Sequence, residues 1–330
     1  MKKFVSIIMC SLMFICSFLA FGCKKEDDNI IKLSEVTHST FYAPLYVAIN
    51  MGFFEDEGLE INLTSGEGAD KVMASITSKS VDIGLMGPEA VIYCHLNNQK
   101  DYPIVFGQLT KRDGSFLVSK VNYENFDWSM VKGKRMLAGR KGGVPAMTLE
   151  YVLNTNGVQT NELNFDTTVS FANMAGVFQA DETVDFTTLF EPTASEVVAS
   201  GKGYIVASVG TDSGEVPYTA FATSKSFMNE KPEKIKKFLK AVTKGYEYIK
   251  NNDSLTVAKA LAPSFPGISE NSLKITIESY LSIDAWCSTP VMTEESFNRL
   301  QDIMENAGEL TSRADFNKVV DNTFAIEVSK

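Results

Sequence analysis

Short apolar runs alternate along the chain with longer segments whose apolar residues recur at helical spacing. Apolar runs bounded by Gly, Pro, Asn or Asp predict strands, and apolar residues at intervals of three and four predict helices. We expect strands at 30–36, 60–63, 81–85, 104–109, 115–120, 135–138, 165–169, 186–189, 204–209 and 218–223. We expect helices at 43–50, 69–78, 88–97, 145–156, 173–180, 192–200, 235–249, 272–281, 293–306 and 314–324. This alternation is typical of an α/β protein.

The alternation restarts part-way along the chain, which predicts two lobes. The polar turn Lys111–Gly114 separates two strands and is the expected first crossing between lobes. We assign 30–114 to lobe one, 115–217 to lobe two, and 218–330 to lobe one again, with a return strand at Tyr218 and C-terminal helices packing on lobe one. A chain of 330 residues is long enough for two domains.

The first 22 residues form a predicted export signal. Lys2 and Lys3 precede an apolar run, and Gly22-Cys23 ends it before a strongly polar stretch. A retained membrane helix is the alternative, because such a run is at the short end of what spans a bilayer. The end of the run resembles a bacterial lipoprotein box, which implies cleavage before Cys23, lipidation of Cys23, and a tether at 23–29. We therefore expect an exported protein, anchored by lipid at the outer face of the cytoplasmic membrane.

Charge and motif content exclude several classes of protein. Lys and Arg number 31 against 41 Asp and Glu, giving −10, and the expected mature chain would carry −12, so a nucleic-acid partner is not expected. The chain has no CxxC pair, no GxSxG motif and two histidines, so we predict neither a metal site nor catalytic residues, and no cofactor. Cys94 and Cys287 are expected to be two separate buried thiols.

Candidate ligand residues follow the predicted strands. Ligands of open α/β sheets bind at the carboxyl ends of strands, and the loops there combine aromatic side chains, carboxylates and glycines. The candidate ligand-binding residues are Thr40, Phe41, Tyr42, Glu67, Gly68, Asp70, Pro88, Glu89, Asp113, Gly142, Gly143, Val144, Glu191 and Tyr218. Acidic residues outnumber basic ones in these loops, which favours a neutral or cationic ligand such as an amino-heterocycle. For each carboxylate, a helix cap or a solvated turn is the alternative interpretation.

Four segments resemble a known family. They are Thr37–Ala48, Met51–Glu60, Lys79–Gly84 with its Val-Asp-Ile-Gly strand, and the turn Phe190-Glu191-Pro192. Together they resemble the solute-binding proteins of ABC transporters of the thiamine-pyrimidine, sulfonate and nitrate type, over most of 30–252.

The resemblance implies a type II periplasmic-binding-protein fold of two α/β lobes joined by two hinge crossings. It also implies a monomer that closes on a small molecule and delivers it to an ABC permease and ATPase. Relatives that bind sulfonate or nitrate offer a hydroxyl where this chain has Val144, so the resemblance favours a pyrimidine thiamine precursor, with alkanesulfonate, taurine or nitrate as the alternative. A related fungal enzyme makes the thiamine pyrimidine with a cysteine-rich iron-binding segment that this chain lacks. A sensor without a transport role is a further alternative.

Overall fold

The computed structural model describes residues 29–330. The predicted signal, Cys23 and the tether up to residue 28 lie outside the described residues. Within 29–330, no helix is both long enough and apolar enough to cross a membrane.

The first sheet contains five strands in the order β2-β1-β3-β10-β4. Its strands are β1 (Ile30–Glu35), β2 (Glu60–Ser65), β3 (Ile83–Met86), β4 (Ile104–Thr110) and β10 (Thr219–Thr223). β1 pairs with β3 in parallel, with Leu33 opposite Ile83. β10 runs antiparallel to both neighbours, β3 and β4. β3 is therefore central and buried along its whole length, whereas β2 is an edge strand.

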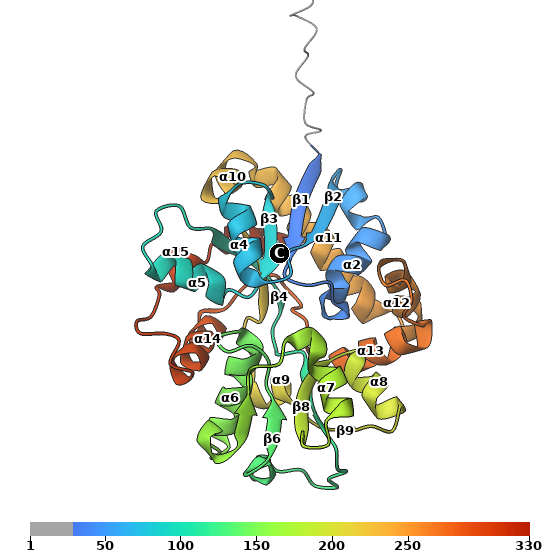
Figure 1. Ribbon diagram of the computed structural model, residues 1–330. Coiled ribbons are helices and arrows are strands. Elements are labelled where there is room, and N and C mark those ends of the chain that lie inside the picture. The colour runs from blue at the N-terminus through green and yellow to red at the C-terminus, as the bar shows by residue number, and fades with distance from the viewer. Residues whose placement is uncertain (1–28) are drawn as a thin grey trace, which may run out of the picture. The chain divides into compact units, whose positions relative to one another are not determined.

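The second sheet also has five strands, in the order β7-β6-β8-β5-β9. They are β5 (Ser115–Ser119), β6 (Arg135–Leu137), β7 (Asn164–Asp166), β8 (Phe186–Phe190) and β9 (Tyr204–Ser208). β6 lies parallel to β7 and β8, and β5 lies antiparallel to β8 and β9. The chain changes sheet between Thr110 and Ser115 and again between Ser208 and Thr219 (Figure 1). The two sheets confirm the predicted fold class. The predicted limits of the two lobes, at 30–114, 115–217 and 218–330, stay a prediction.

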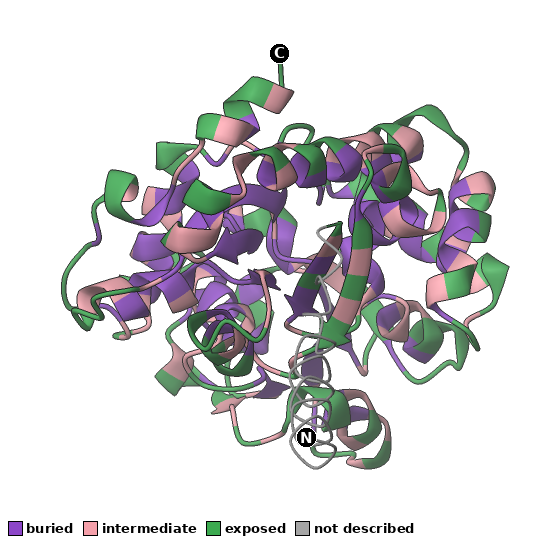
Figure 2. Ribbon diagram, turned by 90° about the horizontal axis from the view of Figure 1, so that it is seen from above, coloured by how far each residue is buried: buried purple, intermediate pink, exposed green. Residues whose placement is uncertain are grey.

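Helices cover both sheets, with one side buried and the other exposed (Figure 2). In the first part of the chain they are α2 (Ala43–Asn50), α3 (Phe53–Asp56), α4 (Ala69–Thr77), α5 (Glu89–Leu96), α6 (Val144–Thr155), α7 (Met174–Ala180), α8 (Thr193–Ala199) and α9 (Val209–Ser213). The later helices are α10 (Lys225–Glu230), α11 (Pro232–Asn251), α12 (Ser254–Leu261), α13 (Glu270–Ser282), α14 (Glu294–Asn306), α15 (Phe316–Val319) and α16 (Thr323–Val328).

The longest helix within residues 29–330, α11, buries the apolar stripe that its sequence predicts. Ile235, Phe238 and Leu239 are fully buried, and α11 packs against α2, α3 and α16. A Cβ at Gly245 would lie 2.1 Å from the backbone oxygen of Pro44, so α11 and α2 approach each other too closely for any other residue. The α2–α11 pair therefore holds the segment before α2 in place.

Three sequence predictions need correction. The single helix expected at 314–324 is wrong: α15 ends at Val319, and Val320 forms a parallel bridge with Val105 of β4 before α16 begins. The expectation that the C-terminal helices pack on lobe one is incomplete, because α13 contacts α8 and α14 contacts α6, both of which follow strands of the second sheet. Cys94 and Cys287 form no disulfide, and Cys94 is buried as expected. Cys287 is partly exposed, so the expectation of a second buried thiol is wrong.

Candidate functional site

The turn between β1 and α2 brings three predicted ligand residues to the end of the first sheet. Thr40, Phe41 and Tyr42 form a 3₁₀ turn, η1, and all three are buried. The Ser39 hydroxyl caps this turn by accepting from the Phe41 N–H at 3.2 Å. Phe41 packs so closely on Gly114 that a Cβ there would lie 2.5 Å from the Phe41 ring. Gly114, in the first crossing, therefore leaves the space that the Phe41 ring occupies.

Contacts between the two sheets converge on this turn. The Thr40 hydroxyl donates to the backbone oxygen of Glu191, which follows β8, at 2.8 Å. The Phe41 ring lies 5.4 Å from that of Phe190 and 5.8 Å from that of Tyr218. The Trp286 indole donates to the Phe41 backbone oxygen at 2.8 Å. In this conformation the ends of the two sheets are therefore in direct contact.

Glu89 is a buried carboxylate at the start of α5. Pro88 is the N-cap of that helix, and the pair follows the central strand β3, so the side chain is placed inside the molecule. Burial raises the pKa of Glu89 to about 7, although backbone N–H groups at the helix start and the Arg140 charge act to lower that pKa. The Glu89 Oε2 atom is buried and has no hydrogen-bond partner among residues 29–330.

Asp113 is a second buried carboxylate, in the first crossing between the sheets. Its Oδ1 atom accepts a hydrogen bond from the backbone N–H of Ser115 at 2.7 Å. Burial raises the pKa of Asp113 to about 7, against the lowering effect of Ser115 and Tyr218. Within the described part of the chain, the Asp113 Oδ2 atom has no hydrogen-bond partner, and neither does the nearby Tyr218 hydroxyl.

These two carboxylates share one region with two tyrosines, and we call Tyr42, Glu89, Asp113 and Tyr218 the acidic cluster. Burial raises the pKa of Tyr218, and the charges of Asp113, Tyr42 and Glu89 raise it further. Burial likewise raises the pKa of Tyr42, with contributions from Glu35 and Glu89. All four side chains are less than a tenth exposed. A buried carboxylate is stable only when it is protonated or meets a donor or a cation, so the cluster suits a ligand with N–H groups or positive charge.

Glu191 is buried beside the acidic cluster, but its carboxylate is already engaged. It accepts hydrogen bonds from the Ser195 backbone N–H at 3.0 Å, from the Ser195 hydroxyl at 2.7 Å and from the Ser279 hydroxyl at 2.8 Å. The Glu191 backbone N–H donates to the Tyr280 hydroxyl at 3.1 Å. The Glu191 carboxylate thus bonds the first turn of α8 from the position before its N-cap, Pro192, and links α8 to α13. Its role as a ligand residue stays a prediction.

Of the remaining candidates, the loop 67–70 is at the surface, whereas the turn before α6 follows Arg140, whose charge acts on Glu89. Glu67 and Asp70 are exposed, and Glu67 pairs with Lys71 at 3.5 Å, one helical turn on. Gly68 is the N-cap of α4. Gly142, Gly143 and Val144 start α6, and a Cβ at Gly142 would lie 3.5 Å from the Glu309 carboxylate. The structure therefore brings together Thr40, Phe41, Tyr42, Pro88, Glu89, Asp113, Glu191 and Tyr218, but not the loop 67–70.

Two residues that pack beside η1 come from the C-terminal half of the chain and were not predicted. Tyr280 lies 5.1 Å from Phe41, ring to ring, and Trp286 lies 5.7 Å from Tyr280. Tyr280 lies in α13, a helix of ordinary periodicity, and Trp286 lies after its end, so no local signal marks either residue. Among the described residues, no group of His, Cys, Asp or Glu is arranged to hold a metal ion.

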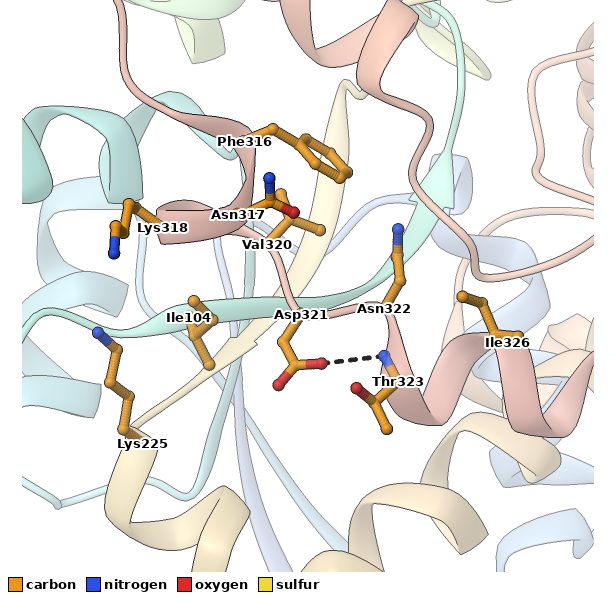
Figure 3. Close-up of a pocket in the computed structure, with 10 residues that line it drawn as sticks. All are labelled: Ile104, Lys225, Phe316, Asn317, Lys318, Val320, Asp321, Asn322, Thr323 and Ile326. Carbon is orange, nitrogen blue, oxygen red and sulfur yellow. Dashed lines mark hydrogen bonds between the residues drawn. The ribbon is translucent and has the colours of Figure 1, made fainter.

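An open groove of about 630 Å³ lies elsewhere, beside the edge strand β4 (Figure 3). Ile104 and Val320 form part of its floor, and Lys225 and Lys318 lie at one end. The Lys225 ammonium sits 4.1 Å from the centre of the Tyr102 ring. None of the candidate ligand residues lines this groove.

Comparison with known proteins identifies the family. A family model described as NMT1/THI5 like matches residues 39–254. The chain belongs to this family. A Bacillus subtilis relative named "Putative binding protein YtlA" is 38% identical over 314 residues, which is 94% of either chain. The resemblance drawn from the sequence is confirmed, and this NMT1/THI5-like protein is a solute-binding protein of the family.

Two further comparisons concern fold and enzyme relatives. The periplasmic aliphatic sulphonate binding protein SsuA from Escherichia coli superposes with a TM-score of 0.71 at 14% identity, covering 89% of this chain and 98% of that chain. That likeness establishes the periplasmic-binding-protein fold. The 4-amino-5-hydroxymethyl-2-methylpyrimidine phosphate synthase of Schizosaccharomyces pombe is 29% identical over 110 residues, which is 33% of this chain and 31% of that protein.

Proposed function

We propose that this solute-binding protein is the capture subunit of an ABC importer outside the cytoplasmic membrane, and that its ligand is a small amino-heterocycle such as a pyrimidine thiamine precursor. In this proposal the protein is a monomer held to the membrane by lipid on Cys23. It closes its two lobes on the ligand and presents the closed form to a permease and its ATPase.

The observation that carries the ligand class is the pair of unpartnered carboxylate oxygens. Glu89 Oε2 and Asp113 Oδ2 are both buried, and neither has a hydrogen bond of normal geometry within the described residues, although the Tyr218 hydroxyl is close enough to Asp113 to lower its pKa. A sulfonate or nitrate would bring further negative charge to this region, whereas an amino group or a ring N–H would satisfy both oxygens. The Tyr42 ring supplies a flat surface against which a heterocycle can stack, whereas the Phe41 ring is already packed on Gly114 and Phe190.

We expect Glu89 and Asp113 to contribute to ligand affinity, and the exposed Glu67 and Asp70 not to. Each buried carboxylate would accept a charge-assisted hydrogen bond, worth about 1.5–3 kcal/mol, or about ten- to a hundredfold in affinity. Glu67 and Asp70 lie in solvent, where such bonds are screened. Glu89→Gln and Asp113→Asn should therefore weaken ligand binding, and Glu67→Gln and Asp70→Asn should not.

A thermal-shift panel tests the proposal, because a ligand that binds only the native state raises its melting temperature. The panel contains aminopyrimidines, thiamine, taurine, alkanesulfonates and nitrate, and any hit is repeated by calorimetry on the four variants. We expect stabilisation by an aminopyrimidine or thiamine and its loss in Glu89→Gln and Asp113→Asn. Stabilisation by sulfonates or nitrate alone would overturn the ligand class, and turnover of pyridoxal phosphate and iron to a pyrimidine phosphate would replace binding by synthesis.

A further inference from the structure

A second polar network lies directly before the turn that carries Phe41 and Tyr42. It joins Glu35 at the end of β1, His38 in the following loop and Tyr46 of α2. The His38 Nδ1 atom lies 2.9 Å from Glu35 Oε1 and 2.9 Å from the Tyr46 hydroxyl. The Tyr46 hydroxyl also donates to Glu35 Oε2. Glu35 is fully buried, whereas the His38 side chain is 46% exposed.

The other ring nitrogen of His38 reaches a distant part of the chain. His38 Nε2 lies 2.8 Å from the backbone oxygen of Ser264. A carbonyl oxygen can only accept, so Nε2 carries a hydrogen and donates. Ser264 ends η5 (Ala262–Ser264), the short turn between α12 and α13. The ring also packs on Phe265 at 4.7 Å, so His38 links the loop before Thr40 to the α12–α13 corner.

The positions of these atoms determine how many protons the network holds. With Nε2 protonated, a neutral His38 would have a bare Nδ1. Nδ1 and an ionised Glu35 Oε1 would then face each other at 2.9 Å as two acceptors. The Tyr46 hydroxyl has one proton and cannot bridge every contact of the three groups. One further proton must therefore lie between Glu35 and His38, on either residue.

The ionisable groups around the His38 ring are few. Glu35 faces it from β1 and Tyr46 from α2, while η5 and the residue after it present the Ser264 carbonyl and the Phe265 ring. Tyr42 lies beyond them, near enough for the Glu35 charge to raise its pKa. Loss of the shared proton would leave Nδ1 and the Glu35 carboxylate facing each other as two acceptors at 2.9 Å. Their repulsion would push the ring away from Glu35 and strain its Nε2–H bond to the Ser264 oxygen, which weakens the attachment of the loop.

We propose that His38 is a positioning residue for the segment 37–42, which we call the ligand loop, and that it holds this loop to the α12–α13 corner most firmly while the Glu35–His38 pair retains its proton. The α13 helix carries Ser279 and Tyr280, which bond Glu191 after β8. His38 thereby couples the ligand loop to the helix that reaches the second sheet. The consequence for ligand affinity rests on the proposed function, whereas the coupling itself does not.

Trp286 reports on the ligand loop without any ligand, because its indole is buried and donates to the Phe41 backbone oxygen. In a Trp128→Phe background it is the only tryptophan, since the chain has two. Its fluorescence is followed between about pH 5 and pH 9, the range in which histidine charge changes matter. His95 is the only other histidine, so His95→Gln is the matched control for His38→Gln.

We expect Trp286 emission to move to longer wavelength as pH rises, in the background protein and in His95→Gln, and to move less in His38→Gln. Glu89 and Asp113, whose pKa values burial raises to about 7, account for the pH dependence that remains in His38→Gln. An unchanged pH profile in His38→Gln, or its loss in His95→Gln, overturns the proposal. If Trp128→Phe fails to fold, nitrogen-15 spectra of the two imidazoles in the full-length natural sequence replace fluorescence. A His38 ring that is not protonated at Nε2 would then refute the coupling.

Ligand affinity forms a separate arm. At pH 7, His38→Gln should weaken binding of an aminopyrimidine by about tenfold, the loss expected when one hydrogen bond no longer holds the loop. If the fluorescence result holds and no aminopyrimidine binds, the positioning role stands and the proposed function fails. If an aminopyrimidine binds but His38→Gln leaves both readouts unchanged, the proposed function stands and the positioning role is wrong.

Discussion

Replacing Asp113 by Asn should stabilise the ligand-free protein at neutral pH and have no effect in acid. Asp113 Oδ1 accepts from the Ser115 N–H, and an Asn oxygen can keep that bond. Asp113 Oδ2 is buried without a partner, and an Asn NH₂ in its place could donate to the Tyr218 hydroxyl, which also has none among residues 29–330. The substitution removes a buried charge and keeps the shape of the side chain.

The size of the effect follows from the pKa of Asp113. Burial raises that pKa from 3.8 to about 7. The native state therefore keeps a proton that the unfolded chain releases, and stability falls as pH rises through this window. At about 1.36 kcal/mol per pH unit, ionisation of Asp113 costs roughly 4 kcal/mol once the pH exceeds its folded pKa. Asn avoids this cost, so the gain in free energy of unfolding from Asp113→Asn grows from near zero at pH 4 to about 2–4 kcal/mol at pH 8. The lower figure allows for relaxation of the structure around the ionised carboxylate.

Urea unfolding of ligand-free protein, refolded to remove any co-purified solute, measures this advantage between pH 4 and pH 8. An entropy of unfolding near 2.1 cal/mol/K per residue converts the gain at pH 8 into a melting-temperature increase of about 3–6 °C. Asp70→Asn, on the exposed loop after β2, should change neither quantity. An Asp113→Asn advantage that is the same at pH 4 and pH 8, or a net destabilisation at pH 8, would refute the reasoning that Asp113 is an uncompensated buried charge.

Two further predictions concern packing around the acidic cluster. Gly114→Ala should cost about 1–3 kcal/mol in urea unfolding, because its Cβ would lie 2.5 Å from the tightly packed Phe41 ring; a cost below about 0.5 kcal/mol would mean that the ring can move freely. Glu191→Ala should lose about 2–4 kcal/mol of stability with a smaller effect on ligand affinity, since its carboxylate bonds Ser195 and Ser279; calorimetry showing a larger loss of affinity than of stability would make Glu191 a ligand contact.

The sequence alone determined the order of the strands along the chain, most of the longer helices and the family, but it missed α3, α9, α10 and α12. Those features follow from local periodicity and from turn residues. In α11, for example, the predicted apolar stripe at Ile235, Phe238 and Leu239 is the buried side. Local pattern failed at 314–324, where the residues favour helix. There the backbone of Val320 pairs with Val105 and the Asp321 N–H donates to the Val105 oxygen, so a partner more than two hundred residues away in the chain outweighs the local preference.

Only the tertiary structure decided which of the predicted carboxylates are buried. Asp70 and Glu89 look alike in sequence, since each is acidic and lies in the first turn of a helix after a strand. β2 is an edge strand and β3 a central one, so the loop after β2 meets solvent and the loop after β3 is covered from both sides. Asp113 is buried because it lies where the chain passes between the sheets. Strand order, which no local pattern encodes, therefore decides that Asp70 is solvated and that Glu89 is buried and needs a donor.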